Sequence, residues 1–236
     1  MGLNFEFMAE VFPVIVKKLP INLELTFIPF LAGLAIAVVI TFLREIKLKA
    51  LQWFLRFYIS FIRGTPLVLQ LYLVFYALPE LARAVFGLLG KEFDINKLSV
   101  MLLCMIALSI NISAYLAETI RSGISAVRIG EIEAGYSISM TKAQVMRRIV
   151  LPQAFQISLP NLCTLIIAAL QNTVVVFFVT LEEMNAMGSI AAQNNWLYFE
   201  SFLVVGLIFW VITILTEMFF HALERYAGLE KKQTAV

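Results

Sequence analysis

The run LPINLELTFIPFLAGLAIAVVITFL, Leu19–Leu43, decides the fold class of this chain. It carries one charged residue, Glu24, and a helix needs about 20 apolar residues to cross the hydrocarbon layer of a bilayer. The chain as a whole is 61% hydrophobic and 14% charged, whereas a soluble globular protein is roughly half apolar and about a quarter charged. The sequence therefore predicts an all-α integral membrane protein.

Four further apolar segments bring the prediction to about five membrane-spanning helices. The second segment, residues 65–78, is short and Pro79 interrupts it, so residues 81–89 form either an interfacial helix or a bent continuation of this span. The third, fourth and fifth spans are predicted at residues 98–120, 152–179 and 199–223. A polar and acidic connection, residues 181–198, separates the last two spans.

The distribution of Lys and Arg predicts the orientation of the chain. These residues gather in segments 44–63 and 121–148 and in the C-terminal tail, and they are sparse in the connections between. Because Lys and Arg accumulate in cytoplasmic loops, the N-terminus is expected outside and the C-terminus in the cytoplasm. An odd number of spans, such as five, satisfies this arrangement.

The two ends of the chain are expected to lie outside the spans. Residues 1–18 predict an amphipathic interfacial helix, because apolar residues recur at helical spacing at Phe5, Met8, Val11, Phe12 and Ile15. Acids precede any base in this segment, so a cleaved signal peptide is not expected. Residues 229–236 are predicted to form a flexible tail.

The composition gives no support for catalysis, metal binding or nucleic-acid binding. Cys104 and Cys163 lie in apolar segments without CxxC spacing, and His221 has no second ligand near it in the sequence. The net charge is only +2, and no run of Lys and Arg exceeds two residues. We therefore expect a non-enzymatic chain in contact with membrane lipid, with no metal site, no cofactor of its own and no nucleic-acid partner.

The polar segment GEIEAGYSISMTKAQVMRRIVLP, residues 130–152, reads as two short cytoplasmic helices. A break is expected near Ser139, and Thr141-x-x-Gln144 forms a capping box for the second helix. Pro152 forces a boundary and starts the fourth span. Small and apolar residues on the first helix suit docking in a groove of a partner, although packing against the chain's own bundle is equally open from the residues alone.

This segment resembles the EAA loop of the membrane permeases of ATP-binding-cassette (ABC) importers. Five residues match in register: Glu133, Ala134, Ile149, Leu151 and Pro152. Gly135 stands where the family usually has Ala. Ser139 stands where the family usually has Gly, which adopts a left-handed backbone more easily than Ser.

Two other segments resemble the polar amino-acid branch of these permeases. The first is the structural motif Arg63, Gly64, Thr65 and Pro66, and the second is residues 114–121 of the third span. The resemblance covers roughly residues 19–228 and implies one permease domain over this range, with the EAA loop at about residues 129–152. It implies a multi-pass subunit of the bacterial cytoplasmic membrane that takes up a polar amino acid.

The resemblance also implies a set of partners. These are a second permease subunit, identical or closely related, an extracytoplasmic amino-acid-binding protein, and cytoplasmic ATPase subunits that bind ATP and Mg²⁺. The chain lacks a Gly-x-x-x-x-Gly-Lys-Ser/Thr segment, which fits hydrolysis on a separate subunit. The residues expected to couple to the ATPase are Glu133, Ala134, Gly135, Tyr136, Ser139 and Met140.

Polar side chains inside the spans are the candidates for a substrate pathway. On the third span these are Asn111, Tyr115 and Glu118, which share one helical face, and Glu118 can also pair with Arg121. On the fourth span they are Gln171, Asn172 and Thr173, where related permeases usually have Lys-Asp-Thr. These three cannot all face one side, so we expect a locally opened helix or polar surroundings on more than one side. Hydrogen bonding between helices is the structural alternative for all six.

Two other classes of function were weighed. An ATP-independent secondary transporter or channel often shows an internal repeat or ionisable groups at the middle of the membrane, and the sequence shows no repeat. A membrane enzyme would need a convergent nucleophile, acid–base pair or metal cluster. Transport that persists without ATP would favour the first, and turnover of a substrate without transport would favour the second.

Overall fold

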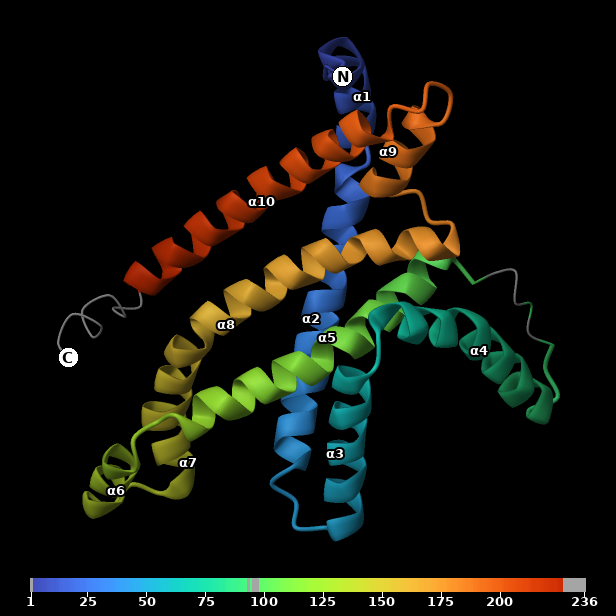
Figure 1. Cartoon of the computed structure of the whole chain (residues 1–236). Coiled ribbons are helices and arrows are strands. Elements are labelled where there is room, and N and C mark those ends of the chain that lie inside the picture. The colour runs from blue at the N-terminus through green and yellow to red at the C-terminus, as the bar shows by residue number, and fades with distance from the viewer. Residues whose placement is uncertain (1, 93, 95–97, 227–236) are drawn as a thin grey trace.

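The computed structural model describes residues 2–92, 94 and 98–226, and every regular element within them is helical (Figure 1). Five helices are long and apolar enough to cross a membrane: α2 (Leu19–Leu43), α4 (Leu67–Leu88), α5 (Val100–Ser125), a continuous helix over Lys142–Val179, and α10 (Tyr198–Tyr226). This confirms the predicted all-α membrane fold with five spans.

Helix α5 lies at the centre of the bundle, because small residues let α2 and the Lys142–Val179 helix approach it closely. A Cβ atom added at Gly33 of α2 would lie 2.3 Å from Ile112 Cγ2, and one added at Gly123 of α5 would lie 2.1 Å from Ser158 Oγ. In lipid, helices associate through such close packing rather than through the hydrophobic effect. In the most apolar 18-residue segment of each helix, 61% of the α5 segment is buried but only 11% of the α4 segment.

Helix α3 (Lys49–Gly64) fills the basic stretch 44–63, where no helix was predicted. Leu55, Ile59 and Ile62 are buried in the cluster that α2 and α5 also form. On another side, Trp53, Phe57 and Phe61 are exposed and stack on one another. Because charged residues separate these apolar positions, the helix shows only as a 3.6-residue periodicity and not as an apolar run.

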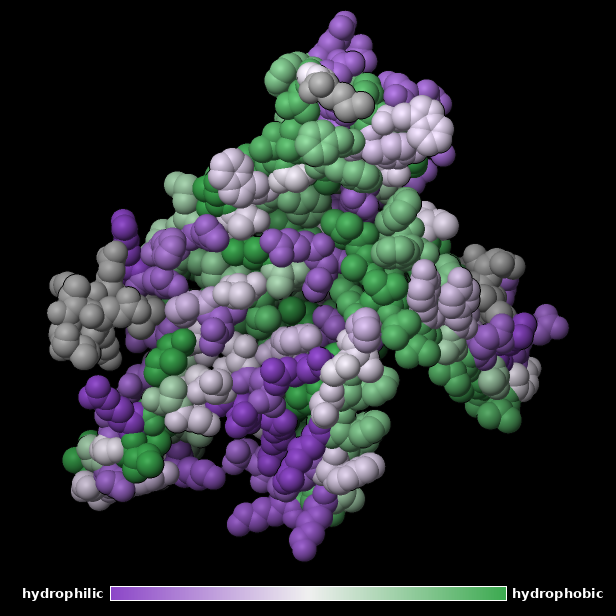
Figure 2. All heavy atoms as spheres, viewed as in Figure 1, coloured by the Kyte–Doolittle hydropathy of each residue, from purple (hydrophilic) through white to green (hydrophobic). Residues whose placement is uncertain are grey.

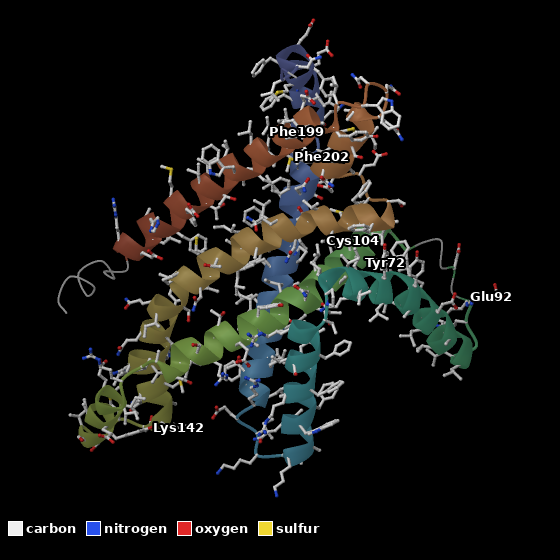
Figure 3. The ribbon with its side chains drawn as sticks, viewed as in Figure 1. Tyr72, Glu92, Cys104, Lys142, Phe199 and Phe202 are labelled. Carbon is white, nitrogen blue, oxygen red and sulfur yellow. The ribbon has the colours of Figure 1, made fainter. Side chains whose placement is uncertain are left out.

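Helix α4 runs without a break through Pro79, so the predicted interruption at that residue is wrong and the continuous alternative is confirmed. Apolar residues continue on both sides of Pro79, although Glu80 and Arg83 interrupt the second side. Backbone groups in lipid must find hydrogen-bond partners inside the segment, which favours a helix on both sides. Figure 1 shows α4 leaving the rest of the bundle after its first turns. In the first turns of α4, Tyr72 packs against the apolar cluster that contains Cys104 of α5 (Figure 3).

The boundary predicted at Pro152 is a change of helix type and not a break in the helix. Short helices α6 (Ile129–Ser137) and α7 (Lys142–Val145) lead into a π-helical turn, Met146–Val150, and then into α8 (Leu151–Asn172). Pro152 lies in the first turn of α8, directly after the π-helical turn. A 3₁₀ segment, Thr173–Val179, completes the continuous helix.

The N-terminal helix is present as α1 (Phe5–Val16), but its apolar face contacts protein rather than only the membrane surface. Phe7, Val11 and Ile15 are buried in one cluster with residues of α10 and of α9 (Met184–Ala192), a helix within the predicted connection 181–198. Figure 3 labels Phe199 and Phe202 in the first turns of α10, near this cluster. The predicted tail, residues 229–236, lies outside the described residues.

Candidate functional site

Helices α6 and α7 fold back on each other as a hairpin, which we call the α6–α7 hairpin (residues 129–145). A Cβ atom added at Gly135 would lie 2.7 Å from Ile149 Cδ1 and 3.1 Å from Val145 Cγ2. Gly135 is therefore buried inside the hairpin, where the absence of a side chain lets α6 lie directly on α7 and the π-helical turn. Gly135 was predicted on the docking surface instead.

The turn of the hairpin forms as the sequence predicts. Ser139 breaks the helix with a left-handed φ of 61°. The Thr141 N–H donates to Gln144 Oε1 at 2.8 Å, and the Gln144 N–H donates to Thr141 Oγ1 at 3.3 Å. Both hydrogen bonds of the capping box are thus present, and α7 begins at Lys142, which Figure 3 labels at the lower end of the hairpin.

Three large apolar side chains are exposed on the hairpin, among polar residues such as Glu133, Ser137 and Lys142. Ile129, Tyr136 and Ile138 are 72%, 47% and 74% exposed. The other predicted coupling residues divide between the surface (Glu133, Ala134 and Ser139) and partial burial (Met140). Ile129 and Ile138 were not predicted as coupling residues, because the exposed face of so short a helix depends on where its neighbour packs.

A polar groove lies where α2, α3 and α5 meet. Glu118 of α5 accepts hydrogen bonds from Arg44 Nη1 at 2.9 Å and from Arg121 Nη2 at 2.8 Å. The predicted Glu118–Arg121 pair is therefore confirmed, and Arg44 at the end of α2 is a second partner that spacing along α5 does not reveal. The Arg63 guanidinium lies 5.6 Å from the centre of the Tyr115 ring, within the range of a cation–π contact.

The groove consists of two adjoining hollows. One has a volume of about 530 Å³ and is lined by Arg44, Arg56, Ile59, Ser60, Arg63, Gly64, Tyr115 and Glu118. The other, of about 400 Å³, shares Arg44, Arg56 and Glu118 with the first and adds Gln52 and Arg121. Four arginines thus face one carboxylate. In Figure 2 a hydrophilic band covers this region beside α3, and the opposite side of that helix is apolar.

Asn111, a predicted pathway residue, forms a hydrogen bond that joins α5 to α4. It is buried, and its Nδ2 donates to Gln70 Oε1 at 2.9 Å. Gln70 Nε2 in turn donates to the Ile62 carbonyl at 2.7 Å and the Thr65 carbonyl at 3.0 Å. These bonds fix the turn between α3 and α4, and Pro66 directly precedes α4. The motif at residues 63–66 therefore holds Arg63 and Gly64 in the lining of the groove.

Thr173 is also buried and hydrogen-bonded inside the bundle. Asn22 of α2 donates to Thr173 Oγ1 at 2.7 Å and to Glu183 Oε2 at 3.0 Å, and all three side chains are fully buried. Glu183 caps α9 by accepting from the N–H groups of Asn185 and Ala186 at 2.9 and 2.8 Å. Burial raises the pKa of the Glu183 carboxyl above its usual value, although the bonds from Asn22 and from the two N–H groups lower it.

The three polar residues of the fourth span do face different surroundings, as expected. The helix changes from α to 3₁₀ geometry at Thr173. Gln171 is exposed and Asn172 is half-buried, so these two remain available at the surface of the bundle. Asn22 was not selected from the sequence, and its signal was a lone amide inside an apolar span. Glu183 matches an acid of the family but was not among the predicted pathway residues.

Comparison with known proteins gives one family and several full-length relatives. A family model described as "Binding-protein-dependent transport system inner membrane component" matches residues 30–227. The "Probable amino-acid ABC transporter permease protein PatM" of Vibrio harveyi is 35% identical over 219 residues, which cover 92% of this chain and 94% of that protein. The "Probable amino-acid permease protein YxeN" of Bacillus subtilis (strain 168) is 33% identical, with coverage of 94% and 95%.

A solved structure has the same arrangement of helices. The "Crystal structure of an amino acid ABC transporter with histidines" contains a chain that is 29% identical, with a TM-score of 0.81. The match covers 96% of this chain and 100% of that chain.

Proposed function

This chain belongs to the family of inner membrane components of binding-protein-dependent transport systems, and from that membership we propose that it is the permease subunit through which an ATP-driven importer takes up a polar amino acid. Amino-acid transport is what the names of its relatives PatM and YxeN state of those proteins. The chain itself carries out no hydrolysis. ATP and Mg²⁺ are held by a separate ATPase subunit, and an external binding protein delivers the substrate.

The observation that carries this proposal is the link between the α6–α7 hairpin and the membrane. The hairpin exposes Ile129, Tyr136 and Ile138, and an apolar residue in water is most stable when a partner covers it. From α7 the chain stays helical over Lys142–Val179, which includes the fourth span and Thr173. A continuous helix transmits a displacement of the hairpin to the far side of the bundle as a rigid body.

The groove between α2, α3 and α5 is the proposed amino-acid site. A zwitterionic amino acid needs a cation for its carboxylate and an anion for its ammonium group, and Arg63 and Glu118 line the same hollow. Tyr115 lines the same hollow, and its ring centre lies 5.6 Å from the Arg63 guanidinium. Gln171 and Asn172 complete the proposed pathway, whereas Asn111 and Thr173 position helices and do not touch substrate.

The proposed setting is the bacterial cytoplasmic membrane, with the hairpin in the cytoplasm and the N-terminus outside. A second permease subunit, a copy of this chain or a close relative, covers the exposed surface of α8 and completes the pathway. Orientation and assembly both follow from the family and from the positive-inside rule.

The test is uptake by proteoliposomes that contain the permease with its ATPase subunit, supplied with binding protein and radiolabelled amino acids. We expect uptake that requires ATP and that Tyr136→Asp abolishes, because a charge among the exposed apolar side chains of the hairpin prevents docking of the ATPase. The matched control, Ser125→Asp, adds the same charge at an exposed position next to the hairpin and should transport normally. Gly135 is unsuitable for this purpose, since any side chain there disturbs the hairpin itself.

Two results would contradict the proposal. Uptake by the permease alone, without ATP or ATPase, would make the chain a secondary transporter or channel. Equal activity of Tyr136→Asp and Ser125→Asp would remove the α6–α7 hairpin from the coupling mechanism.

A further inference from the structure

Helix α3 presents a stripe of polar side chains to the proposed amino-acid site. Arg56, Ser60 and Arg63 are four and three residues apart, so they lie on one face of the helix, and all three line the same hollow. At 1.5 Å per residue, the Cα atoms of Arg56 and Arg63 are about 10.5 Å apart. Two arginine side chains on one face at this spacing can converge on one small ligand between them.

The arginines of the groove differ in what they bind within the chain. Arg44 bonds to Oε1 of the Glu118 carboxylate and Arg121 bonds to Oε2, and Oε1 keeps a further lone pair for another donor. Arg56 and Arg63 have no carboxylate partner among the described residues, and Arg63 makes only the contact with the Tyr115 ring. Arg56 borders both hollows of the groove, so its guanidinium is available to a ligand in either.

A neutral amino acid does not complete this site. The carboxylate of a neutral amino acid would bind the Arg63 guanidinium, and its ammonium group would bind Glu118. Arg56 would then have no counter-charge. A basic amino acid fits less well, because its side-chain cation would meet Arg56 and no second carboxylate lines the groove. A substrate with a second carboxylate supplies the missing anion, and Arg binds carboxylates with two parallel hydrogen bonds.

We propose that the substrate is an acidic amino acid and that Arg56 is the residue that selects its side-chain carboxylate. This inference rests on the proposed function, since it names the substrate class of the same groove. Selection arises from both attraction of the second carboxylate and repulsion of a cationic side chain. The larger hollow, at about 530 Å³, is within the size range of small-molecule sites.

Direct binding to the purified permease–ATPase complex, without binding protein, tests the proposal free of the receptor's own specificity. The probes are L-glutamate, L-aspartate, L-glutamine and L-arginine. We expect L-glutamate to bind at least about tenfold more tightly than L-glutamine, the effect of one charge-assisted contact. Arg56→Gln should lower the affinity for L-glutamate about tenfold and leave that for L-glutamine unchanged. Arg56→Lys keeps the charge but loses the second hydrogen bond, so it should retain only part of the preference.

Lys49→Gln is the matched control, because it removes one positive charge from an exposed position of the same helix outside the groove. It should bind all four probes as the wild-type protein does. A wild-type protein that prefers L-glutamine or L-arginine, or an Arg56→Gln variant with an unchanged preference for L-glutamate, would overturn the inference while the amino-acid importer still stands. Absence of binding and of ATP-driven uptake for every amino acid would overturn the proposed function as well.

Discussion

Ser139 shows how a single residue can hold a backbone conformation that its side chain disfavours. Its φ of 61° lies in the left-handed region, which costs roughly 1–2 kcal/mol for a residue with a Cβ atom. Its neighbours maintain the turn: the Ser139 N–H donates to the Tyr136 carbonyl at 2.9 Å, and the Met140 N–H donates to the Gly135 carbonyl at 3.1 Å. The break that the family usually makes with Gly is thus retained with Ser.

Replacement of Ser139 by Gly should therefore stabilise the protein. We expect the free energy of unfolding to rise by about 1 kcal/mol, because Gly adopts the left-handed region without a steric penalty. Thermal unfolding in detergent measures this as a higher Tm. The control is Ala134→Gly, at an exposed position inside α6, where Gly should instead lower stability by about 0.5–1 kcal/mol. A Tm that falls in both variants would refute the argument from backbone strain.

At the scale of elements, the contact between α2 and α5 depends on the absence of one side chain. A Cβ atom at Gly33 would lie 2.3 Å from Ile112 Cγ2 and 3.0 Å from the Ser109 carbonyl oxygen. Ile112 can rotate, but the carbonyl belongs to the backbone of a buried helix and cannot move without shifting α5. The position of α5 beside α2, and with it the groove that contains Glu118, thus relies on this glycine.

Gly33→Ala should destabilise the fold by about 1–3 kcal/mol through overpacking of this contact. Gly206→Ala on α10 is the matched control, because nothing lies within 4 Å of the added Cβ atom. The control should be neutral or slightly stabilising, since Ala favours helix over Gly. Thermal unfolding of both variants in the same detergent measures the difference. Equal Tm values for the two variants would show that α2 and α5 do not approach each other as described.

At the scale of the whole molecule, the connections divide into two groups by the positive-inside rule. The α2–α3 connection and the α6–α7 hairpin form one group, expected in the cytoplasm. The α4–α5 connection and the segment between α9 and α10 form the other, expected outside. This orientation is a prediction from the distribution of Lys and Arg.

Cysteine labelling tests this orientation. In a variant without Cys104 and Cys163, single cysteines replace an exposed residue in each connection: Lys47, Lys91, Gly130 and Asn195. A membrane-impermeant maleimide should label Lys91→Cys and Asn195→Cys in intact cells, and label Lys47→Cys and Gly130→Cys only after the membrane is opened. The reverse pattern would place the hairpin outside, where no cytoplasmic ATPase can reach it.

Features that depend on neighbouring residues were predictable from the sequence. The five spans follow from local apolar length, because every backbone group in lipid must be bonded within its own segment. The turn of the α6–α7 hairpin follows from the capping box at Thr141 and Gln144, whose hydrogen bonds span three residues. The family resemblance at residues 130–152 was likewise local and led to the correct family.

Features that depend on distant residues were decided only by the tertiary structure. Asn111 and Gln70 are 41 positions apart, and Asn22 lies 151 positions from Thr173 and 161 from Glu183. A polar residue in an apolar span suits a pathway and a helix contact equally well, and its role depends on which partner packing brings within hydrogen-bond distance. The sequence alone thus determined that polar residues inside the spans matter. Only the packing of the helices decided that Asn111 and Thr173 hold helices together. The same packing leaves Arg56 and Arg63 without a carboxylate partner among the described residues.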